Sequence, residues 1–486
     1  MQQPIRYALA ALLLVAGLAA CKKTTEDVTP APTYSGNKLV NDWIYAQMQD
    51  YYFWNDKLPA YEKTDTTAAP EDYYDALLNK YDATTNPDGD RFSWIAANAD
   101  SLEAALSGES VTTGMQFRLF LTEQGKTNVA GQVLYVAKGS PAERAGLRRG
   151  DVFTKINGQS LTTANYAKLL YAGGTTTYGL ATVNAANQTI TDSNASVSVT
   201  PITFQEDPVF FDSVYTVSGK KVGYLVYNEF NPGPNGSNVA TYDQHIGRIF
   251  ANFKAQGVQE LVLDLRYNPG GSSESATKLA SLIGKGVGPS KVFFKQQYNA
   301  GLTQYLTKEY GADSFNEYFT TEANAIGNQL SRVFVLTSDW TASAGELLIN
   351  GLKPYMTVTL IGDKTYGKNV GSTTISDEEG KIKYGLQPII VKAFNSQDKS
   401  DYTGGFQPDV AVDEPINLRR LGDPQETLLG TALQAIATNG RLAADNRSAA
   451  PLTEIGASLT RKANFGRFTV PYDVLKKAAA ARKAAQ

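Results

Sequence analysis

Residues 260–271 read Glu-Leu-Val-Leu-Asp-Leu-Arg-Tyr-Asn-Pro-Gly-Gly, an apolar run that passes into a glycine-rich turn. The aliphatic run is typical of a β-strand, and proline and glycine are residues that commonly end one. We interpret the turn at Gly270 and Gly271 as a loop that stabilises an anion.

A second stretch, residues 332–346, reads Arg-Val-Phe-Val-Leu-Thr-Ser-Asp-Trp-Thr-Ala-Ser-Ala-Gly-Glu. It predicts another strand, then an elbow of small residues around Ser343, then a helix over 343–353. Lys368 follows in the sequence Tyr-Gly-Lys-Asn-Val-Gly at 366–371. We interpret Ser343 as a nucleophile and Lys368 as its base.

The residue counts disfavour a Ser-His-Asp triad and a Cys-His pair. The chain has one histidine, His245, and one cysteine, Cys21. His245 stands beside an apolar stripe of helical period over 239–253, which is typical of a structural helix residue. A serine hydroxyl needs a base in contact, and a lysine whose pKa is lowered by burial is the usual substitute for histidine. The same counts nearly exclude a His/Cys metal site, so we expect no metal and no cofactor.

Strand and helix patterns alternate through the middle of the chain. Strands are predicted at 221–227, 260–266, 332–337 and 357–361, and helices at 238–256, 273–283 and 343–353. This alternation predicts a βαβ-type catalytic domain with a mostly parallel core sheet, over 206–435. Active sites on such sheets lie at the carboxyl ends of the strands, where the glycine turn and Ser343 both fall.

Length and charge bound the rest of the molecule. A chain of 486 residues is long enough for several domains, and its formal net charge of −3 comes with no long basic run before the C-terminal end. Nucleic acid is therefore not an expected partner. Residues 436–486 are expected to form a C-terminal extension.

The N-terminus has the pattern of an export signal. Arg6 precedes an apolar segment from Ala8 to Ala20, which suits a signal-peptide core and is short for a membrane span. The small residues before Cys21 resemble a bacterial lipoprotein processing box, in which the cysteine is acylated. We therefore expect residues 1–21 to be a lipoprotein signal peptide and 22–37 a tether. Acylated Cys21 would anchor the protein in the bacterial cell envelope, with the outer membrane favoured. An ordinary signal peptide with a chance cysteine is the alternative.

Two domains are expected before the catalytic one. Residues 38–109 predict a small, aromatic-rich helical cap. Residues 110–205 change to short β-branched strands and carry the series Gly-Ser-Pro-Ala at 139–142, Ala-Gly-Leu at 145–147, Gly-Asp at 150–151 and Asn-Gly at 157–158. This series closely resembles a PDZ domain.

The PDZ resemblance implies a peptide-binding groove. In that family the loop before the second strand offers backbone N–H groups to a peptide carboxylate, and the peptide adds as a strand. The loop would here consist of Gly114, Met115, Gln116 and Phe117. A PDZ fold that serves only as a structural lever is the alternative.

Taken together, the motifs between residues 110 and 415 resemble the C-terminal processing peptidase family, PDZ-containing serine peptidases with a Ser/Lys dyad. They are Asp264-Leu265-Arg266, Asn268-Pro269-Gly270-Gly271, the run from Thr341 to Glu346, Gly367-Lys368, and the run from Gly404 to Asp409. The resemblance implies that Ser343 attacks a peptide carbonyl and that neutral Lys368 takes the hydroxyl proton. The N–H groups of Ala344 and of Gly270 or Gly271 would hold the oxyanion.

Three further side chains are expected to support the pair. Glu346 can reach back to the Ser343 N–H as a capping-box glutamate. The family often carries a glutamine four residues after the lysine, which orients the amine, but Ser372 occupies that place here. Asn369 is the nearest amide, so Lys368 is expected to be oriented differently.

The sequence therefore predicts a membrane-anchored serine endopeptidase that acts on peptides or unfolded proteins. One alternative is a catalytically silent lipoprotein that binds peptides through the same PDZ-like groove. Another is an esterase on the same sheet.

Overall fold

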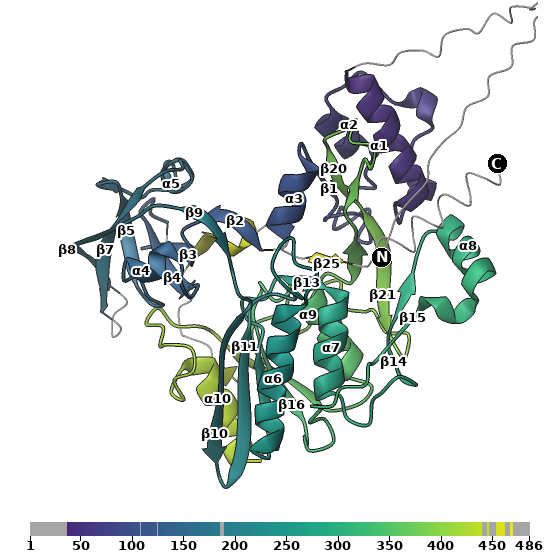
Figure 1. Ribbon diagram of the computed structural model, residues 1–486. Coiled ribbons are helices and arrows are strands. Elements are labelled where there is room, and N and C mark those ends of the chain that lie inside the picture. The colour runs from purple at the N-terminus through teal and green to yellow at the C-terminus, as the bar shows by residue number, and fades with distance from the viewer. Residues whose placement is uncertain are drawn as a thin grey trace, which may run out of the picture.

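The structure is a computed structural model that describes residues 36–106, 108–123, 125–184, 189–439, 445–446, 453–461 and 467–469. The expected signal peptide with Cys21 and almost all of the tether lie outside these residues. In the described part of the chain, no helix is long and apolar enough to cross a bilayer. Figure 1 shows three lobes: a helical cap, a strand-rich lobe and an α/β body.

The cap is helical, as predicted, and is joined to the body by a strand. Its helices are α1 (Asn37–Tyr51), α2 (Pro70–Leu77) and α3 (Ala99–Leu106). Apolar side chains of α1 and α2 enter the same core as the body. The short strand β1 (Trp94–Ala96) pairs with β20 (Gly385–Gln387) of the body, so the cap is held against the catalytic domain by backbone hydrogen bonds.

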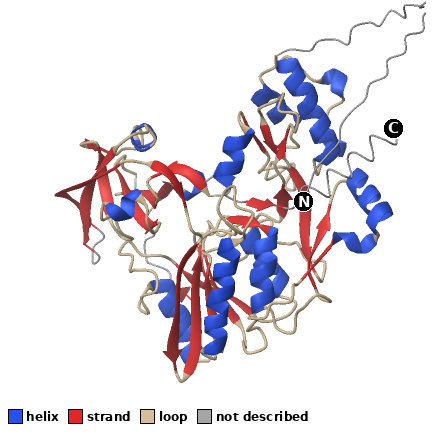
Figure 2. Cartoon of the chain, viewed as in Figure 1, coloured by secondary structure: helices blue, strands red, loops and turns tan. Residues whose placement is uncertain are grey.

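The strand-rich lobe is the expected PDZ-like domain, at the left in Figures 1 and 2. The chain enters it through β2 (Glu109–Thr112) and leaves through β9 (Ile202–Gln205), which pair antiparallel. The two ends of the lobe therefore lie side by side where it joins the rest of the chain. Its elements are β3 (Met115–Leu121), β4 (Val129–Val136), α4 (Pro141–Arg144), β5 (Val152–Ile156), β6 (Gln159–Ser160), α5 (Tyr166–Leu170), β7 (Thr176–Asn184) and β8 (Thr189–Val199).

The body is built on a seven-stranded sheet with a parallel centre, as predicted. Its order is β10-β11-β12-β16-β17-β22-β23, and only β10 pairs antiparallel among these strands. The strands are β10 (Val209–Val217), β11 (Lys220–Tyr227), β12 (Glu260–Asp264), β16 (Val333–Thr337), β17 (Val358–Gly362), β22 (Val410–Val412) and β23 (Asp445–Asn446).

Helices cover both faces of this sheet, so its central strands β12 and β16 are buried along their whole length. One face packs on α6 (Thr241–Ala255), α7 (Ser273–Ile283) and α9 (Ala344–Leu352). The other face packs on α10 (Thr427–Ala437). The α10 helix runs past the expected domain boundary at 435, because Ala435 and Ile436 are both buried against the sheet.

A second sheet, which the sequence did not predict, lies over the active-site end. Its order is β13-β25-β18-β21-β14-β15. These strands are β13 (Gly270–Ser272), β25 (Arg467–Thr469), β18 (Val370–Ser372), β21 (Ile389–Asn395), β14 (Val292–Gln297) and β15 (Asn316–Tyr318). Residues 284–330, which lie between the glycine turn and the strand before Ser343 in the sequence, supply β14, β15 and the helix α8 (Ala300–Tyr310).

Candidate active site

Ser343 lies at the elbow between β16 and α9, and its backbone is strained. Its φ of +56° with ψ of −108° is a combination that a serine rarely adopts. Thr341 Oγ1 donates to Leu265 O at 2.8 Å and Ala342 N–H donates to Asn268 O at 3.1 Å, which ties the elbow to the turn after β12. Ser343 is 1% exposed, and its Oγ has no hydrogen-bond partner among the described residues. These are features expected of a nucleophile held for reaction.

Glu346 joins the segment of the serine to the segment of the lysine. Its Oε2 accepts the N–H groups of Ser343 and Lys368, each at 2.8 Å. Its Oε1 accepts the Gly367 N–H at 2.7 Å and the Thr365 hydroxyl at 2.6 Å. One oxygen therefore brings the backbones of residues 343 and 368 together. Burial raises the pKa of the Glu346 carboxyl, while the four donors oppose that rise.

Lys368 is 4% exposed and lies against the cap. Its Nζ is 4.5 Å from the centre of the Phe92 ring. The neighbouring Arg91 donates from Nη2 to Gly367 O at 2.6 Å and to Thr403 O at 3.1 Å. The cap therefore covers the amine and also fixes the loop that carries it.

The glycine turn is shaped by Asn268 and by close packing. Asn268 Nδ2 donates to Tyr227 O at 2.8 Å, and its Oδ1 accepts the Gly270 N–H at 2.9 Å. Gly271 has φ of +131°, and a Cβ there would lie 2.1 Å from Phe230 O, so only glycine fits.

Of the expected oxyanion donors, Gly270 is thus already bonded within the protein. The strand β13 that contains Gly270 and Gly271 pairs with β25, which also pairs with β18 beyond Lys368. The Ala344 N–H, at the first position of α9, points out of the helix start where an anion is favoured.

The two residues expected to orient the amine have separate partners. Asn369 Nδ2 donates to Ser400 O at 2.7 Å and to Ser400 Oγ at 3.0 Å, so its amide binds a neighbouring loop. Ser372 Oγ accepts from Gln387 Nε2 at 3.0 Å, and both of these side chains are buried. A glutamine from β20 therefore stands next to the position where the family often has one.

The Asp264-Leu265-Arg266 motif serves a buried ion network. Arg266 contacts Asp264 Oδ2 at 2.8 Å, Glu426 Oε1 at 2.7 Å and Glu414 Oε1 at 2.8 Å. Arg149 of the PDZ-like lobe reaches the same Glu414 oxygen at 2.5 Å. Burial alone would raise the pKa of Glu414, but Arg149 and Arg266 hold it well below its usual value. Breaking such a network would leave a buried unpaired charge. We therefore interpret Asp264 and Arg266 as structural residues that hold the turn, not as reacting groups.

A cavity of about 490 Å³ opens beside the glycine turn. Gly271 and Ser272 of β13 border it, together with Phe230, Thr374 and residues of α3 in the cap. The cap therefore helps to shape the space next to the candidate oxyanion site.

The PDZ-like loop is also in contact with another part of the chain. The Phe117 N–H donates to Ser458 Oγ at 2.8 Å, and that hydroxyl donates to Gln116 Oε1 at 2.7 Å. Gly114 has φ of +76°, and a Cβ there would meet Ser140 Cβ at 2.2 Å. The expected loop is therefore shorter than predicted: only Gly114 precedes β3, and Met115, Gln116 and Phe117 are the first three residues of the strand.

Sequence reasoning missed Phe92, Arg91, Gln387 and Ser458. Each lies outside the sequence motifs, and only the folded chain brings it to its place. Neither the buried Gln387 nor the exposed Arg91 belongs to a local sequence pattern that could have identified it.

Comparison with known proteins finds an N-terminal domain, a PDZ domain and a peptidase domain in this order. Residues 221–412 match peptidase family S41, residues 40–94 match the N-terminal domain of S41 peptidases, and residues 132–177 match the PDZ domain. The "Probable CtpA-like serine protease" of Staphylococcus aureus is 26% identical over 396 residues, which covers 75% of this chain and 69% of that protein.

A carboxyl-terminal-processing protease of Synechocystis is 25% identical over 358 residues, covering 72% of this chain and 74% of that protein. A crystal structure of a Bacteroides fragilis protein assigned to the S41 proteases superposes with a TM-score of 0.67 and 28% identity, covering 84% of this chain and 99% of that one. The cap, the PDZ-like lobe and the body are thus those of one known architecture.

Proposed function

The chain belongs to peptidase family S41, and on this basis we propose that it is a serine endopeptidase in which Ser343 is the nucleophile and Lys368 the general base. The observation that carries the proposal is the Glu346 carboxylate, which accepts the N–H groups of both residues. A carboxylate that binds both backbones holds residues 343 and 368 next to each other, as a proton transfer between their side chains would need.

The proposed acylation step begins with a neutral Lys368 amine. Ser343 Oγ attacks the peptide carbonyl carbon while its proton passes to Nζ of Lys368, and the carbonyl oxygen becomes an oxyanion. The C–N bond then breaks as the lysine ammonium returns the proton to the leaving amine. Water hydrolyses the resulting ester with the same lysine as base, which restores Ser343.

Oxyanion stabilisation is assigned to the Ala344 N–H together with that of Gly270 or Gly271. Each donor of this kind contributes about 3 kcal/mol to transition-state stabilisation.

The substrate is proposed to be a peptide or an unfolded protein with an accessible tail. The PDZ-like lobe would hold the tail, and the cavity beside Gly271 would receive the segment to be cut. The cavity is bordered by β13, the strand that also contains the candidate oxyanion donor. A peptide in the cavity would therefore lie next to the oxyanion site.

The test of the mechanism compares Ser343→Ala and Lys368→Arg with the wild type on reduced, carboxymethylated casein. Both variants are expected to lose cleavage, since alanine has no nucleophile and an arginine stays protonated. Retained cleavage in Ser343→Ala would contradict the serine mechanism. A folded wild type that binds peptide but does not cleave it would favour the silent binding protein. Faster turnover of small esters than of peptides would favour the esterase.

Membrane attachment is a separate proposal, supported by the apolar segment before Cys21. We propose that Cys21 is acylated and anchors the protein in the cell envelope, with the outer membrane favoured. Detergent phase partition of the wild type and of Cys21→Ser tests this: the variant is expected to move to the aqueous phase. Equal partition of the two proteins would show that Cys21 is not the anchor.

A further inference from the structure

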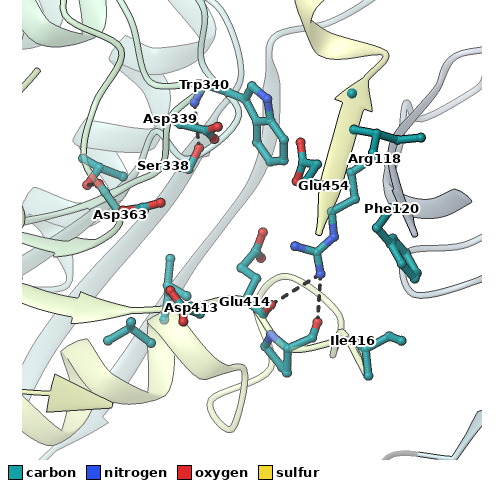
Figure 3. Close-up of a pocket in the computed structure, with 16 residues that line it drawn as sticks. Arg118, Phe120, Ser338, Asp339, Trp340, Asp363, Asp413, Glu414, Ile416 and Glu454 are labelled. Atoms are coloured by element: carbon teal, nitrogen blue, oxygen red, sulfur yellow. Dashed lines mark hydrogen bonds between the residues drawn. The ribbon is translucent and has the colours of Figure 1, made fainter. Parts of the chain in front are cut away.

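One edge of the PDZ-like sheet is occupied by the chain's own C-terminal region. Strand β3 pairs with β4 on one side and with β24 (Glu454–Ala457) on the other. In a PDZ domain this second edge of the strand after the loop is where a peptide adds. Glu454 of β24 lines one cavity with Arg118 and Phe120 of β3, as Figure 3 shows.

The added strand runs in the direction that a bound tail would take. It is antiparallel to β3, with Glu454 opposite Phe120 and Ala457 opposite Arg118. Backbone bonds extend the pairing at both ends: Leu121 N–H donates to Thr453 O at 2.9 Å, and Ser458 N–H donates to Phe117 O at 2.8 Å. The segment therefore approaches the loop at Gly114–Phe117 with its C-terminal end first.

At the loop, Ser458 takes the place of a ligand carboxylate. Its Oγ accepts the Phe117 N–H at 2.8 Å and donates to Gln116 Oε1 at 2.7 Å. Phe117 is the third residue of β3, at the start of the strand, where the backbone N–H groups of a PDZ domain receive a carboxylate. A hydroxyl that accepts this bond satisfies the donor without bringing a negative charge.

Side chains anchor the segment on both of its faces. Ile455 packs against the apolar core of the PDZ-like lobe, which contains residues of β3 and α5. Ala457 and Leu459 are buried in a different cluster, together with Tyr267 and Trp340 of the body. The segment thus fills the groove and also touches the catalytic domain.

We propose that residues 453–458 are an internal occupant of the tail-binding edge, and that a substrate tail binds there only by displacing them. The proposal rests on the tail-binding role proposed above. The occupant also defines the partner that fits: an extended peptide with a free carboxylate at the Ser458 position, small residues before it, and an aliphatic side chain where Ile455 lies. A cavity of about 460 Å³ beside Met115, Phe117 and Tyr178 leaves room for a larger terminal side chain.

A tethered occupant competes strongly even when its contacts are weak. A segment joined by a short linker has an effective concentration of roughly 1 mM. If the occupant's own intrinsic Kd is about 10 μM, a free peptide would therefore bind about a hundredfold more weakly in its presence.

The test measures binding rather than cleavage, so it does not depend on the catalytic proposal. The probe is a fluorescein-labelled peptide with the sequence of residues 450–458, Ala-Pro-Leu-Thr-Glu-Ile-Gly-Ala-Ser, with a free carboxylate. The full chain carrying Ser343→Ala is titrated by fluorescence anisotropy. Adding Ile455→Asp is expected to tighten the Kd by at least about tenfold, because it removes the apolar anchor of the occupant. The matched control, Asn194→Asp, adds the same charge at an exposed position of β8, outside the occupant, and is expected to leave the Kd unchanged.

A second variant locks the occupant in place. Arg118 and Ala457 lie opposite each other on β3 and β24, and Cys21 is the only natural cysteine. The double variant Arg118→Cys/Ala457→Cys is expected to lose peptide binding when oxidised and to recover it when reduced. Equal binding by the oxidised and reduced forms, or an Ile455→Asp variant that binds no more tightly than the wild type, would overturn the proposal.

Discussion

Phe92 shows how a single residue outside the catalytic domain can act on its chemistry. The ring lies 4.5 Å from the Lys368 Nζ. An aromatic face attracts the charged form of an amine, whereas the proposed mechanism needs the neutral form. The ring therefore opposes the deprotonation that catalysis requires, while its apolar surface keeps water from the amine.

Replacing Phe92 with leucine should separate these two effects. Leucine keeps the apolar cover but removes the ring face, so the neutral amine persists to lower pH. With a cation–π interaction of about 1 kcal/mol, the ascending limb of the kcat–pH profile should move to lower pH by roughly 0.7 unit. The substitution Phe53→Leu, elsewhere in the cap, is the control. An unshifted profile in Phe92→Leu would mean that the ring does not act on the amine.

At the scale of elements, Glu346 links the start of α9 to the loop before β18. Glu346→Gln keeps the size of the side chain but places an NH2 group against N–H donors, so at least part of the four-bond arrangement is lost. We expect kcat to fall by about a hundredfold or more with a smaller change in KM. Glu379→Gln, on the exposed surface, is the control. A variant with normal kcat would show that the carboxylate does not position the pair.

Helix α6 contains a carboxyl group whose charge should lower the stability of the fold. Burial raises the pKa of Asp243 to about 6, although Ser275 and Lys278 partly oppose this. In the unfolded chain the group ionises near its ordinary pKa of about 4. Between these values the native state keeps a proton that the unfolded state loses, so stability falls as pH rises and the loss is complete above about pH 6.

Asp243→Asn should remove this pH dependence. At about pH 7 the variant is expected to be more stable than the wild type by no more than roughly 3 kcal/mol. Near pH 4 the two proteins should have similar stability. Urea denaturation at the two pH values measures the difference in the free energy of unfolding. A difference that stays the same at both pH values would show that Asp243 is not the responsible group.

The helices and strands of the body could be predicted because each has a local signal. Helix α7 begins after Ser272, whose hydroxyl accepts from Glu274 and Ser275 N–H, and such a cap is visible in sequence. The second sheet could not be predicted, since β13, β18 and β25 are short and contain little apolar alternation. The motifs located Ser343, Lys368 and Glu346, whereas Phe92 and Gln387 depend on contacts between distant segments.

At the scale of the whole molecule, the cap and the body share the active site. Arg91 spans the two by donating to Gly367 O and Thr403 O, and β1 pairs with β20. The loop that carries Lys368 is therefore held from outside its own domain. The C-terminal region also links separate parts of the molecule, since β23, β24 and β25 each join a different sheet.

Arg91→Met should test the role of the cap in positioning the lysine loop. Methionine keeps an apolar stem but cannot donate to the two carbonyl groups. We expect kcat to fall by about tenfold with KM and the melting temperature nearly unchanged. Arg420→Met, at an exposed position, should behave like the wild type. A loss of stability that accounts for the whole loss of activity would contradict a positioning role.

The most direct test of the Ser343–Lys368 pair is the location of a covalent adduct. The wild type and Lys368→Arg are treated with a peptidyl fluorophosphonate, digested, and analysed by mass spectrometry. We predict one adduct, on Ser343, in the wild type and none in Lys368→Arg, because the hydroxyl is nucleophilic only beside a neutral amine. An adduct on another residue, or equal labelling of Ser343 in both proteins, would contradict this mechanism.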